Sequence, residues 1–266
     1  MARENFVLFH GQVADAPTIH INNDGEPIFA MFPLKVLRRP TNSQGFDSKI
    51  YVDMPIIRTR NLQIINLIKN IRQFDMIDIR GVLSSKEVIK KSRCPNCEHI
   101  NASDGNIVYV TPIYLCRRET GLNEKQGLDY LKERNEVSNL VNIIGTVCRE
   151  PQFYTDLNGR NYAQYQIACN RRYHIHEDPD EVKTDYPWIK TFGTQALKDA
   201  ECLQVSSNVY ISGAIQTREI TKTVICEECG CEYEKIQPVA EIVPYYTGYL
   251  SNCIVPEKKA EDDCDD

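Results

Sequence analysis

Short segments in which apolar and polar residues alternate recur along the chain. Ala30, Phe32, Leu34 and Val36 occupy every second position, and residues 163–169 repeat the pattern. This period of two is typical of a β-strand with one buried face. Further candidate strands lie at residues 6–13, 51–58, 76–83, 107–113, 140–147, 186–191, 209–215 and 239–246. The pattern therefore predicts an all-β fold with short helices.

Turn and helix signals arrange these strands into two sets of five. Asp24-Gly25 and Asn158-Gly159 predict hairpin turns. Helical spacing of apolar residues between 62 and 71, and a weaker pattern at 195–203, predict one helix in each set. Three strands, a helix and two more strands are the order of a five-stranded OB-fold barrel. We therefore expect two tandem OB-fold barrels.

The two sets are copies of one another. They align at a shift of 134 residues, which becomes 133 and then 132 at positions where loops are expected. The same register carries Cys94 and Cys97 onto Cys226 and Cys229. A duplicated fold tolerates single-residue slips of this kind in its loops. The expected parts are a first OB domain at 1–115, a helical linker at 116–137, a second OB domain at 138–255 and an acidic, disordered tail at 256–266.

Two C-x-x-C pairs indicate metal chemistry. The chain has eleven cysteines, and four of them form the pairs Cys94/Cys97 and Cys226/Cys229. In a chain of this size, an odd number of cysteines with such pairs favours metal binding over a disulfide framework. Two thiolates at this spacing supply half of a tetrahedral zinc site. We expect each pair at the tip of the hairpin between the fourth and fifth strands of its barrel.

Several arrangements of Zn²⁺ remain open. A single site shared by the two halves uses only the cysteines that repeat identically, and we favour it. One site per half would add His99 and Cys116 in the first half, and Cys231 and Cys253 in the second. A third arrangement pairs the cysteines of two chains, and reduced, metal-free cysteines are the alternative to all three. One or two ions are therefore expected.

The net charge of −6 is unevenly distributed. Residues 257–266 hold six acids and two lysines and account for −4 of it, so a nucleic-acid-binding face has to be a local patch. No stretch resembles a signal peptide or approaches the ~20 apolar residues of a membrane helix. We expect a soluble, cytoplasmic protein without a membrane partner. Sequence motifs of hydrolases and nucleotide-binding enzymes are absent, which predicts that the chain is not an enzyme.

The second repeat contains four informative segments. In order, they are N-L-V-N-I-I-G-T-V-C-R-E-P, N-G-R-N-Y-A-Q-Y-Q-I-A-C-N-R-R, W-I-K-T-F-G-T-Q-A and V-Y-I-S-G-A-I-Q-T-R. Together they resemble the OB domain of bacterial single-stranded DNA-binding proteins. The resemblance implies sequence-independent binding of single-stranded DNA in replication, repair or recombination, and a nucleoid-associated location. Because the family uses four OB domains per assembly, it also implies a homodimer. The cysteine pairs depart from the family, and the tail lacks the family's apolar end, which puts recruitment of replication or repair proteins by the tail in doubt.

The resemblance and the repeat together suggest the DNA contacts. Aromatic rings stack on bases and cations meet phosphates. The candidates are Trp188, Phe192, Lys190, Arg171 and Arg172 in the second half and Arg38, Arg39, Arg58 and Arg60 in the first. Arg60 stands where the second half has Phe192, so the two grooves need not bind equally. Core packing of the aromatics and ordinary solvated charge are the alternatives, and a tandem OB and zinc scaffold for a protein or RNA is the alternative function.

Overall fold

The computed structural model describes residues 3–39, 50–171, 175 and 184–255. The acidic tail and Arg172 lie outside them. Within this part of the chain, none of the helices combines the length and apolar character needed to cross a bilayer.

The first repeat forms a closed five-stranded barrel. Around the barrel the strands are β1 (Glu4–Val13), β3 (Pro27–Arg38), β5 (Ile56–Thr59), β7 (Ile100–Glu119) and β6 (Met76–Arg93). β5 and β7 are parallel, and the other neighbours are antiparallel. Two short strands, β2 (Thr18–Ile21) and β4 (Tyr51–Asp53), pair with β3, and α1 (Leu62–Ile68) lies between β5 and β6 in sequence.

The second repeat forms the same barrel. Its strands, in the same order, are β8 (Asn139–Val147), β10 (Asn161–Asn170), β12 (Trp188–Phe192), β14 (Glu232–Ser251) and β13 (Asn208–Ile225). The additional elements are β9 (Gln152–Thr155), β11 (Thr184–Asp185) and α3 (Gly193–Cys202). Again the third and fifth barrel strands, β12 and β14, are parallel. The predicted fold class, an all-β chain with two tandem OB-fold barrels, is confirmed.

The barrels join through their first strands into one continuous sheet. β1 and β8 pair antiparallel, with Val7 opposite Val141. These two valines are repeat mates at the 134-residue shift, so a pseudo-twofold axis relating the barrels passes between them. Asn5 and Asn139 obey the same symmetry: each buried amide pairs with the backbone of one residue on the fourth barrel strand, at distances of 2.8–3.0 Å. The apolar cores of both barrels merge into one cluster.

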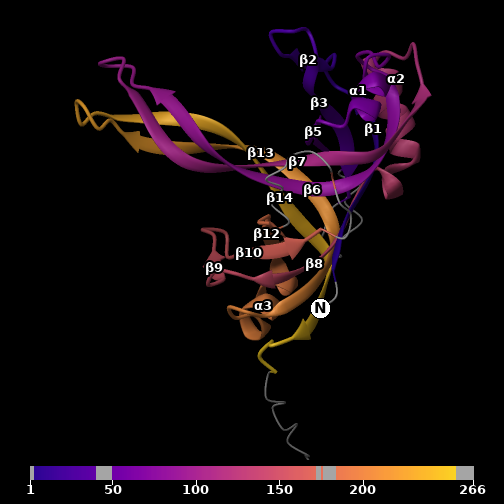
Figure 1. Cartoon of the computed structure of the whole chain (residues 1–266). Helices are drawn as coiled ribbons and strands as arrows, with labels where there is room; N and C mark the ends of the chain where they lie inside the picture. The colour runs from indigo at the N-terminus through magenta and orange to yellow at the C-terminus, as the bar shows by residue number, and fades with distance from the viewer. Residues whose placement is uncertain (1–2, 40–49, 172–174, 176–183, 256–266) are drawn as a thin grey trace, which may run out of the picture.

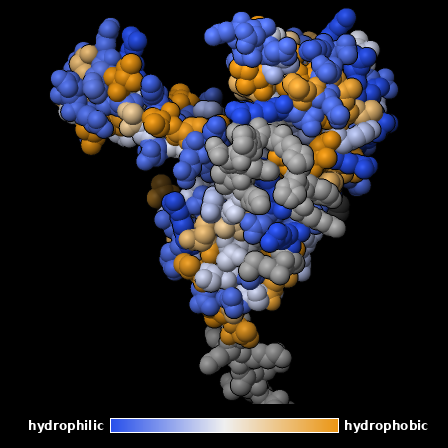
Figure 2. Space-filling view, in the orientation of Figure 1, coloured by the Kyte–Doolittle hydropathy of each residue, from blue (hydrophilic) through white to orange (hydrophobic). Residues whose placement is uncertain are grey.

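The fourth and fifth strands of each barrel are far longer than their apolar patterns predict. β6–β7 and β13–β14 each continue outward as an antiparallel hairpin, and the two hairpins run side by side away from the barrels (Figure 1). We call residues 88–105 and 220–237 the arm. In the arm one face of each hairpin is only half-buried and carries polar side chains such as Ser92 and Lys235, so the alternation of apolar and polar residues that marks a strand in the sequence fades. On the visible face, Figure 2 shows the arm standing apart from the barrels.

Two further boundaries differ from expectation. The single third strand predicted at residues 51–58 is split into β4 and β5, because Pro55 cannot donate to a ladder. β7 runs past residue 115 to Glu119 before the linker begins. The linker forms α2 (Glu124–Glu133), which starts at a capping box between Asn123 and Gln126, and a 3₁₀ turn, η1 (Asn135–Val137).

Candidate nucleic-acid interface and metal centre

Aromatic rings and a cation line the outer face of the second barrel. Tyr162 on β10 pairs with Tyr154 on β9 and with Phe192 on β12. The rings of Tyr154 and Tyr162 stack with their centroids 5.0 Å apart. Lys190 Nζ lies 5.0 Å from the Tyr162 centroid and 5.7 Å from that of Phe192. Burial lowers the pKa of Lys190, and the negative charge of Glu241 offsets part of this shift.

The first barrel repeats this contact with different residues. His20 and Phe29, the repeat mates of Tyr154 and Tyr162, stack at 4.1 Å. Arg58, the mate of Lys190, lies 4.8 Å from the Phe29 centroid and 5.2 Å from that of Tyr109. Two stacked rings followed by a cation therefore occur at the same place on both barrels. We call each set a stacking ladder: Tyr154, Tyr162, Lys190 and Phe192 in one, and His20, Phe29 and Arg58 in the other.

The ladders contain several residues that were not among the sequence candidates. Tyr162 has the same parity along its strand as Gln164 and Gln166, so it belongs to the polar, outward face of that strand. That parity is the signal that could have identified it. Tyr154, His20 and Phe29 come into register only through strand pairing, which sequence patterns do not specify.

The predicted aromatic and cationic candidates are only partly brought together. Trp188 is half-buried on β12 opposite Gln166, two residues before Lys190 on the same face, so it extends the row of the ladder. Arg60 is half-buried at the position equivalent to Phe192. Arg39 is exposed at the end of β3, with its guanidinium 5.3 Å from the Tyr245 ring.

Arg38 and Arg171 occupy a different environment from the ladders. Arg171 Nε and Nη2 lie 2.6 and 2.8 Å from the two carboxylate oxygens of Asp185, and Arg38 Nε lies 2.8 Å from Asp53 Oδ2. The arginine side chains are 9% exposed for Arg38 and 11% for Arg171. Each carboxylate also accepts a backbone N–H from the other barrel's hairpin: Ser85 donates to Asp185, and Thr217 donates to Asp53, both at 2.7 Å.

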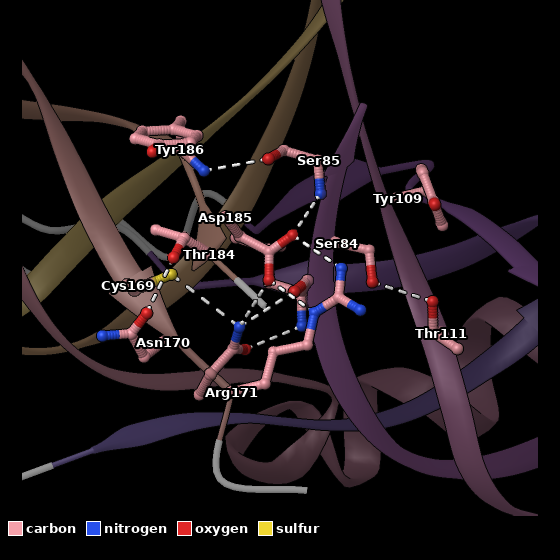
Figure 3. A network of polar contacts seen from close by, with 12 residues as sticks. Ser84, Ser85, Tyr109, Thr111, Cys169, Asn170, Arg171, Thr184, Asp185 and Tyr186 are labelled. Carbon is pink, nitrogen blue, oxygen red and sulfur yellow. Dashed lines mark hydrogen bonds and ion pairs between the residues drawn. The ribbon is translucent and has the colours of Figure 1, made fainter. Parts of the chain in front are cut away.

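These contacts form two equivalent latches, Arg171–Asp185–Ser85 and Arg38–Asp53–Thr217. Figure 3 shows the first of them, with Asp185 between the guanidinium of Arg171 and the backbone of the neighbouring barrel. A cation that is already neutralised and shielded from solvent is poorly placed to meet a phosphate. The structure therefore assigns Arg38 and Arg171 a role in joining the barrels.

The four repeated cysteines meet at the tip of the arm. The Sγ atoms of Cys94, Cys97, Cys226 and Cys229 all lie within 4.8 Å of one another. The cross-hairpin separations are 3.7 Å for Cys94–Cys229 and 3.5 Å for Cys97–Cys226. A tetrahedral ion with zinc–sulfur bonds of ~2.3 Å requires sulfur–sulfur edges of about 3.8 Å. The donor set and its spacing therefore fit one zinc ion shared by both halves.

Matching turns present these thiols. Cys94 N donates to His99 O at 2.8 Å, and Cys226 N donates to Cys231 O at 2.9 Å. Glu98 and Gly230, which are equivalent in the repeat, both have positive φ, of 60° and 68°. The turns thus share one backbone conformation on the two hairpins.

The remaining candidate ligands divide into two groups. Cys231 lies in the cluster, with its Sγ 3.2 Å from that of Cys94. His99 supplies its backbone carbonyl to the turn. Cys116 pairs with Asp78 near the barrel end of β7, and Cys253 follows the end of β14. The length of the hairpins separates these last two cysteines from the tip, so they cannot complete a site there.

Hydrogen bonds within the cluster shift the pKa values of Cys229 and Cys231 in opposite directions. The backbone N–H of Cys231 is the main cause that lowers the pKa of Cys229 to about 6. Contacts of the Cys231 thiol with the sulfurs of Cys94 and Cys229 raise the pKa of Cys231 to about 12. The arrangement favours thiolate at Cys229 and thiol at Cys231.

Comparison with known proteins agrees with the geometry of the barrels. Residues 138–227 match the model of the single-strand binding protein family. The chain carries a domain of this family. The match falls on the second barrel, and the single-strand binding domain it defines includes the whole of the second stacking ladder.

Solved structures extend the likeness in fold to both barrels. The single-stranded DNA-binding protein from Thermus aquaticus is 13% identical, with a TM-score of 0.61, over 94% of this chain and 95% of that one. A deletion mutant of the same Thermus aquaticus protein is also 13% identical, with a TM-score of 0.62, over 97% of this chain and 100% of that one. No curated protein matches the chain significantly by sequence. The structural matches show that the likeness in fold covers both barrels.

Proposed function

We propose that the chain binds single-stranded DNA without sequence preference along the outer faces of both barrels. The observation that carries this proposal is the stacking ladder, which occurs twice with the same ring–ring–cation order. Each base offers a flat face to an aromatic ring whatever its sequence, and a stacked base contributes about 1–3 kcal/mol. Cations beside the rings meet the phosphates, which makes the affinity depend strongly on salt.

The proposed contacts are a revision of the sequence candidates. In the second barrel they are Tyr154, Tyr162, Trp188, Lys190 and Phe192. In the first they are His20, Phe29, Arg39, Arg58 and Arg60. The chain's negative net charge is consistent with this set, since binding requires only a local cationic face.

The proposal also includes one zinc ion at the arm tip, held by Cys94, Cys97, Cys226 and Cys229. Four protein thiolates close the coordination sphere, and a closed site is structural because no position is left for a substrate. Zinc would fasten the two hairpins to one another and would take no part in a reaction. The proposal thus makes the chain a binding protein rather than an enzyme.

A homodimer, which would bring four OB barrels together, belongs to the proposal, as do roles in DNA replication, repair and recombination in the cytoplasm, at the nucleoid. These follow from the family of the second barrel. Native mass spectrometry with and without oligo-dT would give the number of subunits, metal ions and DNA strands in one measurement.

The decisive test uses Trp188, the only tryptophan of the chain. Its fluorescence is followed while oligo-dT, oligo-rU or duplex DNA is added at several salt concentrations. We expect quenching by oligo-dT that weakens as salt rises, and much weaker binding of duplex. Tyr162→Ala should reduce the affinity, whereas Tyr246→Ala, at an exposed tyrosine outside the ladders, should not. Equal responses to all three nucleic acids, or none, would favour the alternative, a scaffold that binds RNA or protein.

A further inference from the structure

Five thiols meet at the arm tip, although a tetrahedral site needs four. Besides the four repeated cysteines, Cys231 places its Sγ 3.2 Å from Cys94 Sγ and 3.3 Å from Cys229 Sγ. The equivalent residue in the first repeat is His99, so the fifth thiol is not part of the duplicated pattern. Because the proposed metal site is complete without it, Cys231 is free for other chemistry.

Cys231 is also the more accessible member of its closest pair. Its residue is half-buried, whereas Cys94 is fully buried. Cys97 and Cys229 are more exposed, but the proposed metal would hold their sulfurs. Cys231 is then the accessible thiol outside the ligand set, and the Cys94 sulfur beside it belongs to the other hairpin. Oxidation of a thiol to a disulfide through a sulfenic acid requires access to the oxidant and a second sulfur within reach, and Cys231 has both.

We infer that Cys231 and Cys94 form a disulfide in response to peroxide, and that the disulfide replaces the metal as the link between the hairpins. The inference rests on the proposed metal site and adds an oxidation site to it.

The chemistry balances with hydrogen peroxide as the oxidant. The Cys231 sulfur attacks one peroxide oxygen and the O–O bond breaks, which leaves a sulfenic acid on Cys231 and releases one water. The Cys94 thiolate then attacks the Cys231 sulfur; the S–O bond breaks, the S–S bond forms, and the hydroxide that leaves takes a proton from solvent to become a second water. The two sulfurs together lose two electrons, and the peroxide gains them. Cys94 is then no longer a thiolate, so the metal site keeps only three of its four ligands.

Chain geometry favours Cys94 over Cys229 as the partner of Cys231. Only Gly230 separates Cys229 from Cys231, and its positive φ of 68° is already fixed by the turn. A disulfide needs a particular separation and torsion of its two residues. Residues on two separate hairpins can adjust to that requirement more freely than residues two apart in a tight turn.

The test uses the full chain purified under reducing conditions with its bound metal. Hydrogen peroxide is added, the metal content is followed by native mass spectrometry, and disulfides are located by peptide mapping without reduction. We expect loss of one metal ion per chain, together with a cross-linked pair of peptides containing Cys94 and Cys231 whose mass is about 2 Da below the sum of the reduced peptides. Cys231→Ser should bind the metal and keep it under peroxide. Cys253→Ser, which removes a thiol remote from the tip, should behave like the parent.

The outcomes separate the two proposals. Metal release from Cys231→Ser at the parent's rate would overturn the inference, and so would a Cys229–Cys231 or Cys97–Cys226 disulfide forming in its place. Protein that carries no metal as purified but still forms the Cys94–Cys231 disulfide would remove the metal proposal and leave the oxidation site supported.

Discussion

The two barrels share one backbone plan but differ in the chemistry displayed on it. In the first, Arg58 lies between the rings of Phe29 and Tyr109. In the second, Glu241 stands where the first barrel has Tyr109, and Lys190 lies over Tyr162 and Phe192. What the duplication has kept is the position of a cation over a ring. Strand pairing fixes that position, so the identities of the ring and the cation can change.

The barrels also differ beneath their helices. Asp199 is a buried residue of α3. Its carboxylate accepts hydrogen bonds from the hydroxyls of Thr191 and Tyr249, each at 2.7 Å, and from the side-chain amide of Gln195 at 3.0 Å. The aligned position in the first barrel is Leu67, and α1 packs instead through isoleucines. Burial raises the pKa of Asp199, and the three hydrogen bonds offset part of this shift. One helix is therefore held by apolar contact and the other partly by a polar cluster.

The largest effect is expected when a latch is broken. Asp185→Ala leaves Arg171 buried without its carboxylate, and breaking a buried ion pair from one side costs about 3–5 kcal/mol of unfolding free energy. Asp53→Ala should cost less, because Asp53 receives only Nε of Arg38 whereas Asp185 is bound by two nitrogens of Arg171. Urea unfolding measures both. The control is Asp104→Ala, at an exposed acid of the arm; a cost for Asp185→Ala as small as the control's would show that the latches do not stabilise the fold.

Removing one ring from each ladder compares the two barrels as DNA-binding surfaces. Tyr162→Ala and Phe29→Ala should each weaken oligo-dT binding by about 1–3 kcal/mol if each ring stacks on one base. We expect the larger loss for Tyr162, because in the second ladder the ring of Phe192 follows it while Arg60 occupies that position in the first. Fluorescence titration at fixed salt gives both affinities. An unchanged affinity for Phe29→Ala alone would restrict the DNA site to the second barrel.

Two acids, one in each barrel, should contribute to the pH dependence of stability with opposite signs. The raised pKa of Asp199 means that its ionisation disfavours the folded state: this contribution is absent below pH 3.8 and grows as pH rises through the raised pKa. Asp78, in the first barrel, has a lowered pKa, because hydrogen bonds from His10 and Arg118 outweigh its burial. Its contribution to stability is present above pH 3.8 and is lost as pH falls through the lowered pKa.

Matched variants isolate these two contributions. Asp199→Asn should gain stability relative to the parent as pH rises, and Asp78→Asn should lose it, with both differences shrinking at low pH. Urea unfolding of the variants and the parent at matched pH values measures the differences. If the stability difference from the parent changed in the same direction with pH for both variants, the contrast between Asp199 and Asp78 would be wrong.

The smallest effect on the barrels is expected from removal of the metal. Chelation should free the arm tip and leave the latches and ladders intact, because they lie at the barrels. Hydrogen exchange should therefore quicken in the arm, at residues 88–105 and 220–237, with little change in β1 or β8. Loss of protection at the β1–β8 pairing would mean that the arm supports the barrels as well as itself.

Much of the fold could be predicted because its signals are local. Alternation, turn residues and the repeat predicted two OB barrels, and the C-x-x-C spacing predicted a thiolate metal site. The ends of β6, β7, β13 and β14 could not be predicted, because the half-buried face of the arm carries polar side chains such as Lys90, Ser92 and Lys235, so apolar residues do not alternate there. Arg38 and Arg171 look like free cations in the sequence, since the acids that bind them are 15 and 14 positions away.

The sequence by itself determined the duplication, the order of strands and helices, and the positions of the cysteine pairs, because each depends on residue types at short or regular spacing. Only the tertiary structure decided which cations are buried in latches, which rings stack, and that four cysteines from two hairpins lie within 4.8 Å of one another. Those outcomes depend on contacts between residues up to 164 positions apart. Strand register and the pseudo-twofold pairing of Val7 with Val141 set such contacts, and no local pattern records them.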